Sequence, residues 1–402
     1  MNEHKNPKII CSQCHDVISE TKDGDCPKCG GKPNVIYDFR NSDEYLIREV
    51  PKVLEQRKIN KLNGLVHGLD SLVINTEIDL HQSAVTELCE TTGSIWYLDS
   101  INQDFHLSML QTNEKNPKLD YSPKILIQSR LRPQNPFYGF NLNKKTRDLP
   151  NTRIETFNFR CSNLDKYFEI QNERGITFMT ENIQEYDNFS YIQTAPSHYI
   201  GCSYGFIQWH GKEGDYSLNN ANTHRPDYKK PNKNYLDNIK YVDHTATRIR
   251  ARDRDAGILE FLELTNYTFD FAIYALDLNS ITSVARYSPD DFAMVFTSGI
   301  TPFIGSESTG PTERYTFNYG TRVHHIAFHT EEITETYSKL KEDGMEFLIE
   351  LLGGENDGLH QTFTKQSPNT MTVNEYIHRY GDFKGFFTRS NVRDLTKSTY
   401  KQ

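Results

Sequence analysis

The chain has 402 residues, 36% of them hydrophobic, and a formal net charge of −9. It contains no stretch of about 18 consecutive apolar residues, so we expect no membrane-spanning segment. The acidic balance argues against general nucleic-acid binding, because attraction to phosphates needs a basic surface. The first ten residues are polar and lack the apolar core of a signal peptide, which makes a cytoplasmic location the expectation.

Four of the seven cysteines form two Cys-x-x-Cys pairs near the N-terminus: Cys11, Cys14, Cys26 and Cys29. Four thiolates at this spacing suit a tetrahedral Zn(II) ion, so the pattern predicts a structural zinc ribbon over residues 1–34. A redox role would need only one such pair, inside a βαβ unit. A module of this size depends on its metal to fold, and it could dock on a protein partner or on the rest of the chain.

Residues 35–238 show a mixed α and β pattern, for which we expect a degenerate βαβββ-type domain and a linker. Residues 35–64 are charged and are expected to form a connecting strand and helix. Within the following region, residues 151–178 have the pattern of a strand, a helix and a second strand. Residues 211–238 are polar and rich in Asn, Lys and Pro, which predicts a linker or a long loop.

Residues 239–402 contain an internal repeat. A strand over 241–250 precedes an amphipathic helix and three further strands. The same order restarts with a strand at 322–330, again followed by a helix and three strands. The repeated unit is therefore strand–helix–strand–strand–strand, and the fold class is α+β.

The repeats place three metal-ligating residue types at related positions. His244 and His325 lie on the first strands of the two repeats, each within a Val-x-His-x-Ala pattern. Glu375 lies on the apolar face of the last predicted strand, where an unpaired carboxylate is costly. Taken alone, a strand histidine is more often a hydrogen-bonded core residue than a ligand, and the glutamate could be a charge at a strand end that reaches solvent. Together, two imidazoles and one carboxylate suit Fe(II) that must also bind a substrate and O2.

His324, next to His325, needs a separate interpretation. Successive side chains of a strand point to opposite faces, so the two histidines cannot share one role. His325 is the counterpart of His244, and His324 is predicted to face away from the metal. We therefore expect the variant His324→Ala to keep the iron that His325→Ala loses.

At these residues the region from about 240 to 402 resembles 4-hydroxyphenylpyruvate dioxygenase and the related hydroxymandelate synthase, in the vicinal-oxygen-chelate superfamily. The matching segments are VDHTATRIRARDR, TERYTFNYGTRVHHIAFHTEEI, GLHQTFTK, NTMTVNEYIHR and GFFTRSNVRDL. The resemblance implies paired βαβββ modules that form open barrels, with Fe(II) held by His244, His325 and Glu375. It also implies that Gln361 lies close to the metal and the 2-oxo acid.

The resemblance extends to the substrate pocket, where the sequence also departs from the family. Phe386 and Asn391 match a phenylalanine and an asparagine of the C-terminal helix that closes the pocket, whereas Phe387 is expected in the core. Ser283 matches a family serine, and Ser298 ends the segment 296–298 that replaces a family Pro-Leu-Asn. A second family phenylalanine is replaced by Val392. Because these positions hold the aromatic ring in the family, the substrate need not be 4-hydroxyphenylpyruvate.

The activity implied by the resemblance is that of a non-haem Fe(II) dioxygenase. Its small-molecule 2-oxo acid binds the iron, O2 reacts, CO2 is lost, and the rest of the same molecule is oxidised. An extradiol dioxygenase or a glyoxalase-type enzyme of the same superfamily is the first alternative. A non-catalytic zinc-ribbon adaptor or ligand-binding protein is the second. Self-association into a homo-oligomer is compatible with each of these three functions.

Overall fold

The computed structural model describes residues 8–11, 17–18, 26, 30, 33–36, 39–119, 121–303, 309–381, 383 and 385–402. Near the N-terminus it contains a small antiparallel sheet of β2 (Val17–Ile18), β1 (Lys8–Cys11) and β3 (Pro33–Ile36). Cys14 and Cys29 lie outside the described residues. The four-cysteine zinc site therefore stays a prediction.

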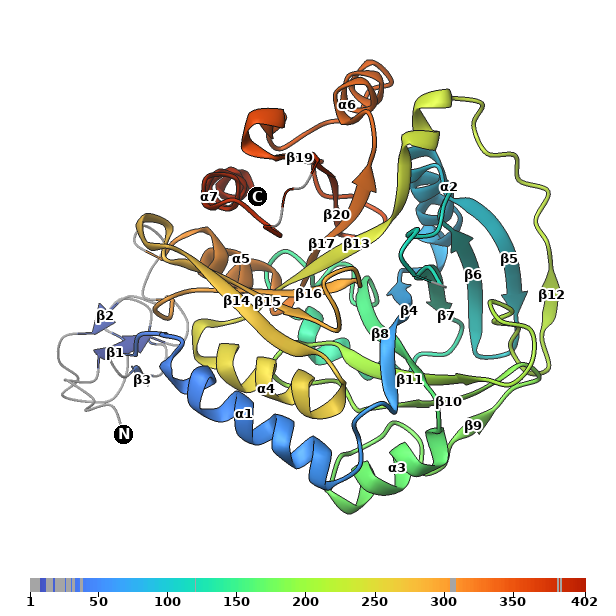
Figure 1. The fold of residues 1–402 in the computed structure, drawn as a ribbon, viewed down its shortest axis with the longest axis horizontal. Coiled ribbons are helices and arrows are strands. Elements are labelled where there is room, and N and C mark those ends of the chain that lie inside the picture. The colour runs from blue at the N-terminus through green and yellow to red at the C-terminus, as the bar shows by residue number, and fades with distance from the viewer. Residues whose placement is uncertain are drawn as a thin grey trace.

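The first large sheet is built from two units of the same kind (Figure 1). The first unit is β4 (Val66–Asn75), α2 (His81–Thr92), β5 (Ile95–Ile101), β6 (Phe105–Gln111) and β7 (Lys124–Arg130). The second is β8 (Arg153–Cys161), α3 (Leu164–Glu173), β9 (Gln184–Glu185), β10 (Phe189–Gln193) and β11 (Ser203–Trp209). The central strands β4 and β8 pair antiparallel, and β12 (Asn222–His224), from the predicted linker, pairs with β5 at one edge.

The second large sheet repeats this arrangement. Its first unit is β13 (Ile239–Arg248), α4 (Arg254–Leu264), β14 (Thr268–Ala275), β15 (Ser280–Arg286) and β16 (Ala293–Ser298). Its second is β17 (Arg322–Thr330), α6 (Ile333–Glu342), β18 (Leu352–Gly354), β19 (Leu359–Phe363) and β20 (Val373–Arg379). The strand order is β14-β15-β16-β13-β17-β20-β19-β18. The predicted α+β fold of paired βαβββ modules is confirmed.

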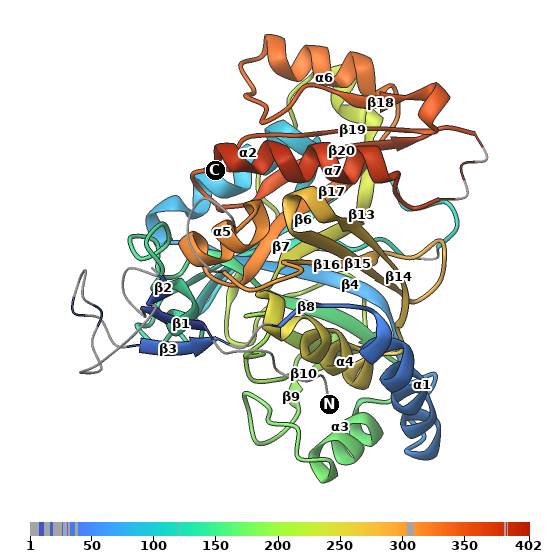
Figure 2. The ribbon, with the colours of Figure 1, turned by 90° about the vertical axis from the view of Figure 1, so that its left-hand side faces the viewer.

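Among the described residues, three further α-helices belong to neither pair of units. α1 (Glu44–Ile59) runs beside α4 (Figure 1). Its Arg57 donates hydrogen bonds to the carbonyl oxygens of Leu262, Thr265 and Tyr267. α5 (Pro311–Tyr319), which the apolar pattern did not predict, begins at a proline and ends before a glycine, the usual signals for helix ends. α7 (Arg389–Ser398) lies across the second sheet near β18 and β19 (Figure 2).

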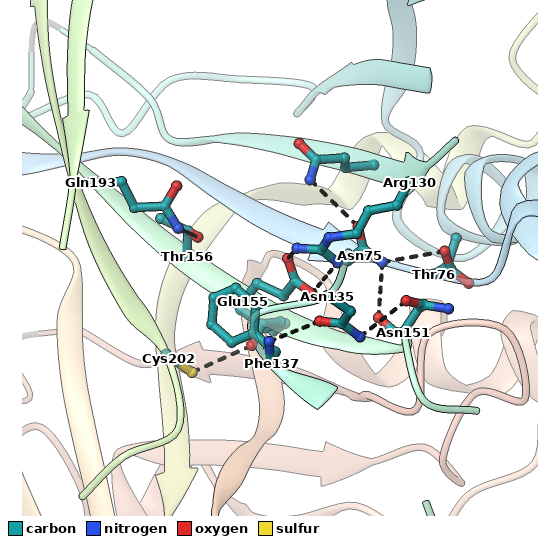
Figure 3. A network of polar contacts seen from close by, with 12 residues as sticks. Asn75, Thr76, Arg130, Asn135, Phe137, Asn151, Glu155, Thr156, Gln193 and Cys202 are labelled. Carbon is teal, nitrogen blue, oxygen red and sulfur yellow. Dashed lines mark hydrogen bonds and ion pairs between the residues drawn. The ribbon is translucent and has the colours of Figure 1, made fainter. Parts of the chain in front are cut away.

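Polar side chains of the first sheet form hydrogen bonds with one another (Figure 3). Arg130 on β7 donates two hydrogen bonds, of 2.6 and 2.5 Å, to the carboxylate of Glu155 on β8. Beside them, Gln193 on β10 donates to the hydroxyl of Thr156 at 2.9 Å. Because the charge of Glu155 is already neutralised by Arg130, this carboxylate is not available to a metal.

In the described part of the chain, every helix is too short or too polar to cross a membrane.

Candidate metal centre

The structure brings His244, His325 and Glu375 together. They lie on β13, β17 and β20, which are neighbours in the second sheet, and all three side chains are buried. The Nε2 atoms of both histidines lie 3.2 Å from Oε2 of Glu375. One oxygen and two nitrogen ligands thus converge from adjacent strands, the donor set that suits Fe(II).

A charged pair orients His244. Its Nδ1–H donates to Oδ1 of Asp243 at 2.7 Å, and Arg379 at the end of β20 donates to both oxygens of Asp243 at 2.6 and 3.0 Å. Burial alone would raise the pKa of Asp243, but the Arg379 guanidinium and the bond to His244 hold it well below its ordinary value. With Nδ1 engaged as a donor, His244 presents Nε2 to a metal. Sequence reasoning missed both partners, although an aspartate beside a strand histidine is a usable signal.

A β-bulge changes the role predicted for His324. His325 pairs with Ala246, but the next residue of β13, Thr247, pairs with Val323, so His324 is an extra residue on β17. Strict alternation therefore fails, and the Nδ1 atoms of His324 and His325 lie 2.8 Å apart. His324 is outside the ligand cluster, as predicted, but it contacts His325 instead of facing away.

The hydrogen-bond chain through His324 defines the tautomer of His325. Nε2 of His324 lies 2.9 Å from the amide oxygen of Gln402, which can only accept, so this Nε2 carries a proton. Burial keeps His324 neutral by lowering its pKa well below the ordinary value. Its Nδ1 is then an acceptor for the Nδ1–H of His325, which leaves Nε2 of His325 free to bind a metal.

Polar atoms without partners face a small cavity of about 40 Å³ beside the cluster. Gln361, predicted near the metal, lines this cavity, and within the described residues both atoms of its buried amide lack a hydrogen-bond partner. Oε1 of Glu375 also lacks one. Leaving such atoms buried and unpaired is costly, which indicates that they bind something from outside the chain.

The structure does not bring Ser283 and Ser298 to this cavity, which corrects their predicted role. Ser283 accepts a hydrogen bond of 3.1 Å from Arg254 of α4, so it lies on the opposite face of the sheet. Ser298, like Ser283, is absent from the cavity wall, and their neighbours Thr282 and Thr297 line it instead. Both assignments came from the resemblance, whereas in the structure the neighbouring side chains, on the other face of the sheet, reach the cavity.

The predicted roles on the C-terminal segment also need correction. Phe387, expected in the core, lines the cavity, and its ring lies 5.2 Å from that of His244. Phe386 also contacts His244, at 5.5 Å, but it packs with Ala246 and other apolar side chains beside the cavity. Asn391 donates to the carbonyl oxygens of β18 and β19 at 3.5 and 3.4 Å, which holds α7 in place instead of contacting the cavity.

A second cluster with metal-ligating residue types lies in the first sheet, but it is internally satisfied. His81 contacts the hydroxyls of Ser129 and Ser108 at 2.9 Å each. His106 contacts Asp99 at 2.9 Å, and Asp99 also accepts from Ser108. Burial lowers the pKa of His81 to about 3, so this histidine is neutral. The open donor atoms belong to the cluster on the second sheet.

Metal binding should depend on pH through His244. Burial lowers the pKa of His244, but Glu375 and the bond to Asp243 outweigh it and raise the pKa to about 8. The proton stabilises the metal-free fold below pH 6.5, and this contribution is lost as pH rises through 8. Since Fe(II) displaces this proton, its affinity should increase about tenfold per pH unit up to 8 and then level off. Anaerobic Fe(II) titrations between pH 6 and 9 check this, and a flat profile would contradict it.

Comparisons with known proteins support the fold. No family model and no curated protein matches the sequence. A mutant of 4-hydroxymandelate synthase from Streptomyces coelicolor superposes with a TM-score of 0.61 at 13% identity, over 83% of this chain and 98% of that one. A fusion of a xylose isomerase-like TIM barrel with 4-hydroxyphenylpyruvate dioxygenase gives 0.58 at 12%, over 88% of this chain and 57% of that one. The chain therefore has the fold of these proteins.

Proposed function

We propose that the protein is an Fe(II)-dependent dioxygenase that oxidatively decarboxylates a 2-oxo acid and oxidises the remainder of the same molecule. The observation that carries this proposal is the buried cluster of His244, His325 and Glu375, whose open donor atoms face a cavity. Bound Fe(II) would supply positions at which the 2-oxo acid and O2 meet. The fold shared with hydroxymandelate synthase and a 4-hydroxyphenylpyruvate dioxygenase fusion supports it.

The side chains around the cluster have distinct tasks in this proposal. Asp243 and His324 fix the two imidazoles, so that each presents Nε2 to the metal. The unpartnered amide of Gln361 would donate to an oxygen of the chelating 2-oxo acid. Phe387 and Val392 line the cavity and would exclude water from it.

O2 uptake by the Fe(II)-loaded protein against a panel of aromatic and aliphatic 2-oxo acids tests the proposal. We expect uptake with one substrate class, one CO2 released per O2 consumed, and both oxygen atoms of labelled O2 in the same product molecule. The variant Glu375→Ala should show none of this. O2 uptake without CO2 release would point to ring cleavage, and iron binding without any uptake would point to an isomerase or a binding protein.

A further inference from the structure

Arg248 is a buried cation on the wall of the metal cavity. It lies four residues after His244 on β13, so the alternation of the strand places both side chains on the same face. Arg248 and the three ligand residues line one cavity, and the arginine is only 4% exposed. The predicted pocket residues did not include it.

The hydrogen-bonding capacity of Arg248 is largely unused. Nη2 donates to the hydroxyl of Thr399 at 3.1 Å, and the guanidinium lies 5.0 Å from the ring centre of Tyr315. Within the described part of the chain, Nε and Nη1 have no hydrogen-bond partner and no carboxylate forms an ion pair with this residue. An unpaired charge in such a place is expensive, since desolvation is not offset.

Other buried arginines of this fold have more partners than Arg248, although Nε of Arg322 also lacks one. Arg254 is fully buried and forms an ion pair of 2.5 Å with Asp43. Arg322, directly opposite Arg248 on β17, donates to the carbonyl oxygen of Thr152 at 2.6 Å. Neither lines the metal cavity. The free donors of Arg248 therefore point to an anionic ligand in the cavity.

The position of Arg248 indicates which part of a substrate it would contact. Four residues of strand span about 13 Å, so the backbone of Arg248 is well separated from that of His244 along β13. A free guanidinium N–H forms a strong, charge-assisted hydrogen bond with a carboxylate oxygen. The hydroxyl-bearing Thr282 and Thr297 line the same cavity, and Val392 stands where the resembling family has an aromatic side chain.

We propose that Arg248 binds a second carboxylate, at the end of the substrate remote from the metal, so that the substrate is a 2-oxo dicarboxylic acid. This inference rests on the proposed function, because the 2-oxo acid end is taken to chelate Fe(II).

Matched ligand pairs test this without turnover. The protein is loaded with Fe(II) under anaerobic conditions and titrated with 2-oxoglutarate against 2-oxopentanoate, and with 2-oxoadipate against 2-oxohexanoate. The visible charge-transfer absorption of the Fe(II)–2-oxo acid chelate reports binding. We expect at least one diacid to bind about 10- to 100-fold more tightly than its monoacid, as a hydrogen-bonded charge pair would give.

Variants test whether Arg248 causes the preference for the diacid over the monoacid. Arg248→Met should remove the preference and leave the affinity for the monoacid unchanged, and Arg248→Lys should keep part of it. The control Arg322→Lys alters the arginine opposite and should keep the full preference. The ligand-free Arg248→Met protein should also melt at a higher temperature than the wild type, a change that a purely structural arginine would not give.

Three results would overturn the inference. The wild type could bind diacids and monoacids equally, or Arg248→Met could keep the preference for the diacid. Arg248→Met could also weaken both ligands equally, which would place the chelating carboxylate at Arg248. Failure of the proposed function looks different, because then no 2-oxo acid produces the absorption band although Fe(II) stays bound.

Discussion

Replacing Glu375 with alanine should abolish tight Fe(II) binding and leave the protein folded. Glu375 is the anionic member of the cluster, and its Oε2 lies 3.2 Å from both imidazoles. Burial raises the pKa of Glu375, so removing this carboxyl group also relieves a desolvation cost. Changes to the partners of metal ligands already cost about 10- to 100-fold in affinity, so we expect a loss above about 100-fold for the ligand itself. Anaerobic Fe(II) titration and a melting curve measure both properties.

The matched control for Glu375→Ala is His81→Gln in the cluster on the first sheet. His81 is buried and bonded to two serine hydroxyls, so its replacement should leave Fe(II) affinity unchanged even where it lowers stability. The opposite pattern, with iron lost in His81→Gln and retained in Glu375→Ala, would place the metal centre in the first sheet.

The second large effect is expected at the histidine pair of β17. His325→Ala should lose Fe(II), whereas His324→Ala should bind it about 10- to 100-fold more weakly than the wild type. The reason is that His324 accepts the Nδ1–H of His325 and so fixes the tautomer that presents Nε2 to the metal. Fe(II) titrations of the two variants, carried out side by side, measure the difference.

A conservative replacement of His324 tests whether this residue acts by orienting His325 or only by filling space. His324→Asn offers a side-chain oxygen that can accept the same proton, so it should recover part of the affinity lost in His324→Ala. Unchanged affinity in His324→Ala would show that the contact between the two histidines has no part in holding the metal.

The repeat and the convergence of His244, His325 and Glu375 could be predicted because they follow from local patterns. Alternating and helical hydrophobicity defined the strand–helix–strand–strand–strand order, and the sheet topology has this order in both large sheets. His244 and His325 occupy equivalent places in the repeat, and Glu375 interrupts an apolar face. Such features depend on the spacing of residues along a strand, which the sequence contains directly.

Some of the errors concern which side chains of a strand reach the cavity. The bulge at His324 adds one residue to β17, and no local signal in the sequence marks it. Likewise Thr282, and not its neighbour Ser283, reaches the cavity wall. Partners that come from distant elements, such as Arg379 for Asp243, depend on how strands are ordered in the sheet.

Arg248 illustrates a different kind of omission. Its distance from His244 along the strand was available from the sequence and placed it on the ligand face. An arginine on an otherwise apolar strand face is more often exposed or paired, and only the structure shows that two of its donors are buried without partners.

The most direct test of the account is a crystal structure of the Fe(II)-loaded protein, with anomalous scattering measured at the iron absorption edge. We expect one strong anomalous peak within coordination distance of Nε2 of His244, Nε2 of His325 and the Glu375 carboxylate, with Nδ1 of His325 still bonded to His324. A peak among His81, Asp99 and His106, or an ordered Glu375 carboxylate without iron, would contradict it.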